Sequence, residues 1–97
     1  MRTEDMNDYV TSMLDFTTNS IRAFNVGKWY YVFSYNTCIF KGNRVTKGLA
    51  KFNATKYSST TSRIQNTIER LLVKQFRHVV RFDNIPMNTI ELHSVSC

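Results

Sequence analysis

The stretch SIRAFNVGKWYYVFSY, residues 20–35, indicates a β-sheet at the centre of the protein. It is rich in aromatic and β-branched residues, which favour strands, and residues 25–28 at its centre are typical of a turn. Two antiparallel strands are therefore predicted. Because large apolar side chains occupy both faces of the second strand, we expect it to be central, with helices packed on one face of the sheet. These side chains are Trp29, Tyr31, Phe33 and Tyr35 on one face, and Tyr30 and Val32 on the other.

Two other segments have the periodicity of helices. The first has apolar residues at i, i+3, i+4, i+7 and i+8, the pattern of a helix resting on a core: Met6, Tyr9, Val10, Met13 and Leu14. The second follows a run of hydroxyl residues, where Ser62 and Gln65 match a capping box and Thr60 or Thr61 is an alternative cap. Its apolar residues fall in one arc: Ile64, Ile68, Leu71, Leu72 and Phe76. Roughly opposite lie four cations, named here the basic row: Arg63, Arg70, Lys74 and Arg77.

The remaining segments have strand-like patterns. Residues 38–40 run to a break at residues 42–43, and residues 44–46 are predicted to return as a hairpin. Residues 48–56 fit either a short strand or an irregular connection. Residues 78–82 and 89–93 alternate as strands. The predicted fold is a single domain over residues 1–97 of the α+β class, with an antiparallel sheet of about four to six strands and two helices packed on one face.

The composition indicates a cationic protein. Its 97 residues include 13 Lys and Arg against 7 Asp and Glu, which gives a formal net charge of +6. Such an excess attracts nucleic acid, an anionic membrane or an acidic protein surface. No stretch approaches the roughly 20 apolar residues of a membrane helix, and the first residues lack the pattern of a secretory signal. We therefore predict no membrane partner. Because the two cysteines are far apart in the chain, we expect a reducing, cytoplasmic environment.

Catalytic chemistry has little support in the sequence. His78 and His93 lack the spacing of metal ligands. Cys38 could act as a nucleophile with one of these histidines as a distant base, but a single cysteine in an apolar run is usually a small hydrophobe. We therefore predict that the protein is not an enzyme and that it uses no metal and no cofactor.

Binding is better supported, through either cations or rings. The basic row could meet successive phosphates or carboxylates, and plain solvation of its side chains is an equal alternative. Arginine favours recognition because a guanidinium group bonds oxyanions in pairs. The aromatic group Trp29, Tyr30, Tyr31, Phe33 and Tyr35 could stack on unpaired bases if one sheet face were open, although burial in the core is the favoured interpretation.

Two segments carry a family resemblance. VFSYNT at residues 32–37, followed by KYSSTTSRIQN at residues 56–66, resembles a small domain family frequent in bacteriophage genomes. The family pattern is approximately V-S-Y-x-T-P-I and then K-Y-S-x-T-T-S-R-H-Q-N, with Cys38 here at the proline and Ile64 at the histidine. The resemblance implies a phage or prophage origin and no assigned activity. It also implies one local unit beside Arg63, named here the motif cluster, which is a hydrogen-bonded structural unit or a ligand site: Tyr35, Tyr57, Thr60, Thr61, Gln65 and Asn66.

Size, charge and this resemblance lead to a functional hypothesis. We predict a non-enzymatic phage accessory protein that binds and inhibits host nucleic-acid-handling or defence machinery, for example a CRISPR effector. Its partner would be a host protein or a protein–nucleic-acid complex in the cytoplasm of a bacterial host. The alternative is a sequence-tolerant nucleic-acid-binding protein that contacts DNA or RNA directly through the basic row.

Overall fold

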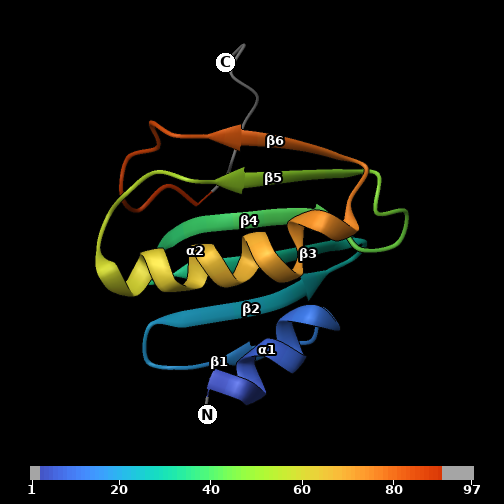
Figure 1. The fold of residues 1–97 in the computed structure, drawn as a ribbon, viewed down its shortest axis with the longest axis horizontal. Helices are drawn as coiled ribbons and strands as arrows, with labels where there is room; N and C mark the ends of the chain where they lie inside the picture. Colours follow the sequence, from blue (N-terminus) through green and yellow to red (C-terminus); the bar gives the residue numbers. More distant parts are fainter. Residues whose placement is uncertain (1–2, 91–97) are drawn as a thin grey trace.

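The chain forms one six-stranded sheet with two helices (Figure 1). The computed structural model describes residues 3–90, with side chains from residue 6. Strands lie in chain order across the sheet, and each pair from β1 to β5 is antiparallel. β6 is parallel to β5, and α2 lies in the connection between them. The elements are α1 (Thr3–Thr11), β1 (Phe16–Thr17), β2 (Ile21–Val26), β3 (Trp29–Ser34), β4 (Thr37–Asn43), β5 (Leu49–Asn53), α2 (Ser59–Leu71), η1 (Val73–Gln75) and β6 (His78–Phe82).

The α+β class is confirmed, and the sheet has the upper number of strands that the sequence predicts. The two strands predicted within residues 20–35 are β2 and β3, and β3 is an interior strand of the sheet. The sheet is mixed rather than purely antiparallel, because α2 carries the chain back across it before β6. Among the described residues no helix is long and apolar enough to span a membrane.

The hairpin predicted to return at residues 44–46 is wrong. Residues 44–46 form a loop, and the strand that returns beside β4 is β5. The loop begins at Arg44, two residues later than expected, and the Asn43 side-chain oxygen stabilises it by accepting hydrogen bonds from the backbone amides of Val45 and Thr46. Thr89 and Ile90 belong to no strand, and the rest of the predicted strand 89–93 lies outside the described residues.

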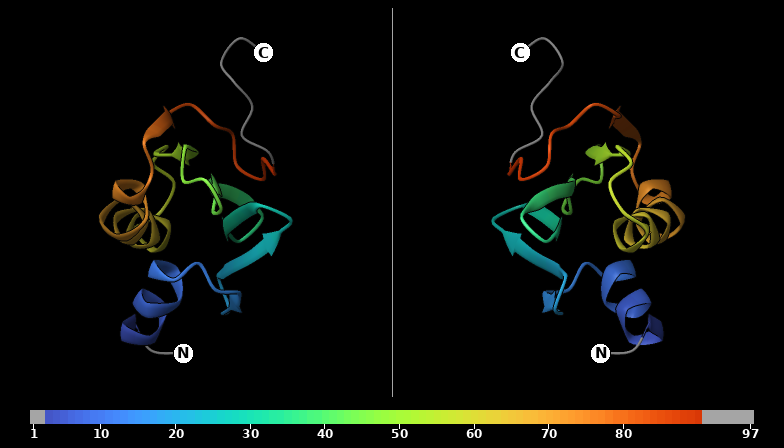
Figure 2. Two further views of the ribbon diagram at one scale, coloured as in Figure 1. Left: turned by 90° about the vertical axis from the view of Figure 1, so that its right-hand side faces the viewer. Right: turned by 90° about the vertical axis from the view of Figure 1, so that its left-hand side faces the viewer.

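Both helices lie on the same side of the sheet, which leaves the other side without a helix in the described chain (Figure 2). The main core lies between the helices and the sheet. From the sheet it includes Tyr30, Val32 and Phe40, which face Ile64 and Ile68 of α2. All five side chains are at least 99% buried. The larger of the two cores therefore lies on one face of the sheet.

A β-bulge in β4 determines which of its side chains lie on the second face of the sheet, which is the side without a helix. Val32 pairs with Phe40, but the next residue, Phe33, pairs with Cys38, so Ile39 is an extra residue in β4. Ile39 and Phe40 consequently both contribute to the helix-side core. The normal alternation then resumes with Lys41 on the second face, where its ammonium group lies over the rings of Trp29 and Tyr31.

Helix α2 begins earlier than the capping box predicts. Its N-cap is Ser58, whose side chain accepts a hydrogen bond from the backbone amide of Thr61. Ser62 lies inside the helix, and the Gln65 side chain donates instead to the backbone oxygens of Asn53 and Thr55. Each of the five hydroxyl residues 58–62 can cap a helix. The Tyr57 hydroxyl is hydrogen-bonded to the Asn53 side chain and to the Ile85 carbonyl. These contacts hold the residue that directly precedes the N-cap of α2.

Helix α1 ends in a Schellman turn with Met13 in a left-handed conformation, φ 54°. The amide of Leu14 donates to the Tyr9 carbonyl, and the amide of Met13 donates to the Val10 carbonyl. Val10 and Met13 are buried, but Tyr9 and Leu14 are 37% and 49% exposed. The apolar stripe predicted for this helix is thus only partly right, because the helix stops at Thr11.

Tyr30 ties the end of α1 to the sheet. Its hydroxyl donates a hydrogen bond of 2.9 Å to the Leu14 carbonyl. Burial, with a smaller contribution from the Asp15 carboxylate, raises the pKa of the Tyr30 phenol well above its ordinary value. The folded state therefore holds this proton more tightly than the unfolded chain does.

Alkaline pH is expected to destabilise the fold through Tyr30. Above the ordinary tyrosine pKa, about 10, the unfolded chain loses a proton that the folded chain keeps, so the free energy of unfolding falls as pH rises. Tyr30→Phe should cost about 1 kcal/mol near neutral pH, from the lost hydrogen bond. Urea titrations between neutral pH and about pH 11 should then show a shallower fall for the variant than for the wild type. Parallel curves would contradict this role of Tyr30.

Candidate nucleic-acid interface

The helix-free side of the sheet carries both aromatic rings and cations. β2 places Arg22 and Phe24 there, and β3 places Trp29 and Tyr31. β4 and β5 add one lysine each. We call this surface the aromatic–cationic face and define it by Arg22, Phe24, Trp29, Tyr31, Lys41 and Lys51.

Strand register brings four of these residues into one row across the sheet. Phe24 pairs with Tyr31, Tyr31 pairs with Lys41, and Lys41 pairs with Lys51. Directly paired residues in antiparallel strands point to the same face and lie next to each other. The row therefore runs from two rings on β2 and β3 to two ammonium groups on β4 and β5.

The rings of this face stack on one another. The centroids of Phe24 and Tyr31 are 5.4 Å apart with an interplanar angle of 18°. Phe24 also stacks on Phe33, at 5.6 Å and 24°. Phe33 is buried and forms a small second core with Cys38 and Phe82. Phe24, Tyr31 and Trp29 are only partly buried, so they border the solvent above that core.

Cations lie over these rings. The Lys41 ammonium is 4.9 Å from the Trp29 ring centroid and 5.4 Å from that of Tyr31. Lys28 lies 5.6 Å from the Trp29 ring, and the Arg22 guanidinium lies 5.4 Å from the Phe33 ring. Strands β1 to β6 contain no Asp or Glu. The described strands therefore give this face cations and no carboxylate.

One corner of the second face is covered by the chain after β6. The backbone amide of Cys38 donates to the Thr89 carbonyl, and the amide of Asn88 donates to the Thr37 hydroxyl. Residues 83–90 follow this path on the helix-free side (Figure 2). Cys38 is fully buried there, which separates its thiol from solvent and weakens the hypothesis of a cysteine nucleophile.

Further cations gather where the β2–β3 turn and the β4–β5 loop meet the segment between α2 and β6. The amide of Arg44 donates to the Lys28 carbonyl, and the amide of Arg77 donates to the Lys47 carbonyl. We call this the cationic end: Lys28, Arg44, Lys47, Lys74 and Arg77. It adjoins the aromatic–cationic face at Trp29, whose ring Lys28 contacts.

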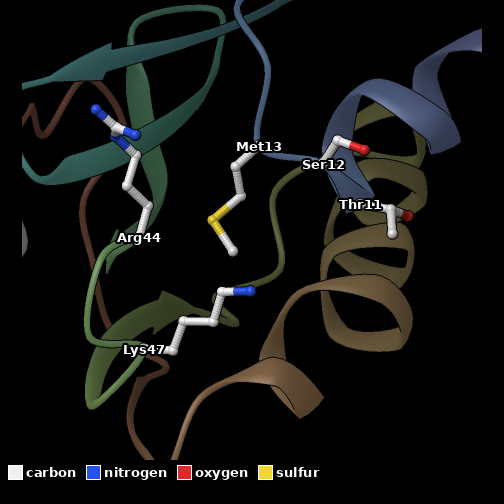
Figure 3. Close-up of a pocket in the computed structure, with 5 residues that line it drawn as sticks. All are labelled: Thr11, Ser12, Met13, Arg44 and Lys47. Carbon is white, nitrogen blue, oxygen red and sulfur yellow. The ribbon is translucent and has the colours of Figure 1, made fainter.

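A hollow of about 160 Å³ lies at the cationic end, between the last residues of α1 and the β4–β5 loop (Figure 3). The guanidinium of Arg44 points away from Lys47 and donates to the Gly27 carbonyl. The ammonium of Lys47 donates to the Gln75 side chain. The two cations do not converge on one position, so the hollow does not have the form of an anion site.

The structure divides the basic row. Arg63 and Arg70 are exposed on α2, but the helix ends at Leu71. Lys74 lies in η1 and Arg77 in the connection to β6, so the prediction of one helical row is wrong. All four side chains are exposed, and none forms an ion pair with a described carboxylate. Lys74 and Arg77 join the cationic end, whereas Arg63 and Arg70 belong to the helix layer.

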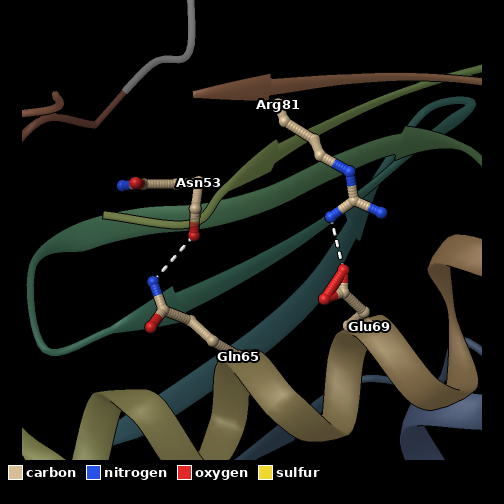
Figure 4. A network of polar contacts seen from close by, with 4 residues as sticks. All are labelled: Asn53, Gln65, Glu69 and Arg81. Carbon is tan, nitrogen blue, oxygen red and sulfur yellow. Dashed lines mark hydrogen bonds and ion pairs between the residues drawn. The ribbon is translucent and has the colours of Figure 1, made fainter. Parts of the chain in front are cut away.

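The motif cluster also separates into two parts. Tyr57, Thr61 and Gln65 form hydrogen bonds between the start of α2 and the sheet, including one between the hydroxyls of Thr61 and Ser34 at 2.8 Å. Figure 4 shows Gln65 reaching Asn53, beside the ion pair of Arg81 with Glu69. The other members are exposed: Tyr35, Thr60 and Asn66. The first part has a structural role in this fold.

The predicted aromatic group likewise falls on different faces. Tyr30 is in the helix-side core, whereas Trp29, Tyr31 and Phe33 are on the helix-free side. Sequence reasoning missed Arg22, Phe24, Lys41 and Lys51 as their neighbours. The available signal in the sequence was a single basic residue within an apolar strand, as at Arg22, Lys41 and Lys51. No group of three potential metal-ligating side chains occurs in the part of the chain that the structure describes.

Comparison with known proteins adds no relative. The sequence matches no family model, and comparisons with curated proteins and with solved structures find no significant match.

Proposed function

We propose that the protein binds single-stranded nucleic acid with little sequence preference, through the aromatic–cationic face. The observation that carries the proposal is the row Phe24, Tyr31, Lys41 and Lys51 on the side of the sheet without a helix. Stacking on aromatic side chains is available to every base, and lysine recognises phosphate as a point charge. The row places both kinds of group next to each other.

The chemistry of this face favours single strands over duplexes. Bases in a duplex are already stacked and cannot reach an aromatic side chain, whereas unpaired bases can. Each stacked base contributes about 1–3 kcal/mol. Phosphates neutralised by Lys41, Lys51 and the cationic end add an electrostatic contribution that salt weakens.

The role as a phage accessory protein that inhibits host machinery stays a prediction from the family resemblance. The proposed binding activity does not depend on it. Arg63 and Arg70, on the exposed surface of α2, remain the candidate residues for a host protein partner.

A fluorescence titration tests the proposed activity. Trp29 is the only tryptophan of the chain and lies on the proposed surface, so oligothymidine should quench its emission. Affinity should fall with salt by roughly 0.7 log units per tenfold change for each phosphate contact. In the double variant Lys41→Ala with Lys51→Ala, the slope of log affinity against log salt concentration should become smaller by about 1.4. Tyr31→Ala should weaken binding about tenfold.

A double variant on the helix layer provides the matched control. Arg63→Ala with Arg70→Ala removes the same charge as the lysine pair and should leave the affinity within about twofold, because long-range attraction between exposed charges is screened. Equal losses in the two double variants would contradict the assignment of the face. No binding to oligothymidine at low salt would contradict the proposed function.

A further inference from the structure

A second feature of the helix-free side is a hollow at the sheet end opposite the cationic end. Its volume is about 340 Å³, and its lining comes from residues 17–20, Arg22, Tyr35 and Asn36. The β1–β2 connection and the β3–β4 turn, which supply most of this lining, lie at the same end of the sheet (Figure 1). The lining contains hydroxyl and amide groups, one guanidinium and one phenol, and no carboxylate.

Arg22 joins this hollow to the aromatic–cationic face. It is exposed on β2, where it pairs with Phe33 on one side and Thr17 on the other. A guanidinium group can bond two phosphate oxygens at once. A nucleic-acid strand bound along the face could therefore place one of its phosphates beside the Arg22 guanidinium, at the edge of the hollow.

Tyr35 has an unusual backbone conformation for its residue type. Its φ is 54°, in the left-handed region, where a tyrosine is strained and asparagine or glycine is favoured. Its amide donates to the Ser20 carbonyl, which holds the β3–β4 turn against the β1–β2 connection. The side chain is 57% exposed, so burial does not compensate for the strain. Met13 and Lys47 have the same φ; the Met13 side chain is 93% buried, whereas that of Lys47 is exposed.

We infer that this hollow is a nucleotide subsite, which holds the phosphate of one nucleotide at Arg22 and its base against the Tyr35 ring. The volume is close to the lower limit of small-molecule pockets, roughly 300 Å³. Residues 17–20 supply hydroxyl and amide groups that can contact the sugar. The inference rests on the proposed function and extends it. The subsite would hold one end of the bound nucleic acid, and it would also bind a nucleoside monophosphate that is not part of a strand.

Amide chemical shifts measured during titration with thymidine monophosphate test the subsite directly. The signals of Arg22 and Tyr35 should move and saturate, while those of Arg63 and Arg70 should not. Thymidine and inorganic phosphate, tested separately, should each bind at least about tenfold more weakly, because each lacks one of the two contacts. Equal affinity for inorganic phosphate and the monophosphate would show an adventitious anion site and overturn the inference.

Substitution of Tyr35 separates recognition from folding. Tyr35→Asn removes the ring and suits the left-handed backbone, so the melting temperature should rise by about 4 °C while affinity for the monophosphate falls about tenfold. Arg22→Gln should cause a similar loss of affinity, whereas Arg63→Gln should cause none. Unchanged monophosphate binding in both Tyr35→Asn and Arg22→Gln would overturn the subsite.

The two proposals fail in different ways. If oligothymidine quenches Trp29 but thymidine monophosphate leaves the Arg22 and Tyr35 signals in place, the subsite is wrong and the proposed function stands. If the monophosphate binds at these residues but oligothymidine does not bind, the subsite stands and the proposed function is wrong.

Discussion

Gly42→Ala is expected to lower the free energy of unfolding by about 2 kcal/mol. A Cβ atom at this position in β4 would lie 2.6 Å from the Phe76 ring and 2.8 Å from the Phe40 ring. Both rings are buried, and they pack edge to face at a centroid distance of 5.5 Å. Replacing glycine in a strand gains only about 0.5–1 kcal/mol from the unfolded chain, so the clash decides the sign. Urea denaturation of the variant measures this loss.

A second glycine and a double variant show whether the clash is the cause. At Gly48 the nearest atom to an added Cβ is the Thr46 hydroxyl oxygen at 3.4 Å, so Gly48→Ala should change stability by less than about 0.5 kcal/mol. Phe76→Leu should make space at Gly42, and the loss in the double variant should be smaller than the sum of the two single losses. Additive losses would contradict the proposed clash.

Asn53→Asp is expected to cost about 3 kcal/mol at neutral pH, the largest effect predicted for a single atom replacement. Asn53 is fully buried, and its amide nitrogen donates to the Cys38 carbonyl and to the Tyr57 hydroxyl. A carboxylate has no proton to donate, and it would place a charge beside the Cys38 carbonyl oxygen. The same substitution at the exposed Asn66 should change stability by less than about 0.5 kcal/mol.

The loss at Asn53→Asp should depend on pH. Burial raises the pKa of an introduced carboxyl group above its unfolded value, so the folded protein takes up a proton as pH falls. The stability difference between variant and wild type should therefore narrow toward about pH 4 and widen toward neutral pH. Urea titrations at about pH 4 and at neutral pH measure this stability difference. A difference independent of pH would show that no buried charge forms.

The sequence predicts the central hairpin and the helix face well because each depends on local periodicity. The side chains of residues 29–34 point alternately to the two faces of the sheet, and both sets include large apolar side chains. This pattern identifies an interior strand. Ile64, Ile68 and Leu72 follow the helical period, and all three are buried. Local signals of this kind do not require knowledge of which segments meet in space.

The features that were missed depend on contacts between distant segments. Residues 58–62 all have hydroxyl side chains, and the structure places the N-cap at Ser58, directly after Tyr57, whose hydroxyl contacts Asn53 and Ile85. The bulge at Ile39 has no sequence mark of its own, although it determines the face of Lys41. The predicted basic row assumed that the helix continues past Leu71, whereas the chain turns there to join Phe76 to the core.

The parallel pairing of β6 with β5 bears on the order in which the chain folds. Strands β1 to β5 join their neighbours through short connections, so their pairings close small loops at low entropic cost. β6 reaches β5 only after residues 54–77, which include α2. Because distant pairings form slowly, we expect β6 to be added last and to exchange its amide hydrogens early in native-state opening. Most of the aromatic–cationic face lies on β2 to β4 and would keep its shape while β6 is detached.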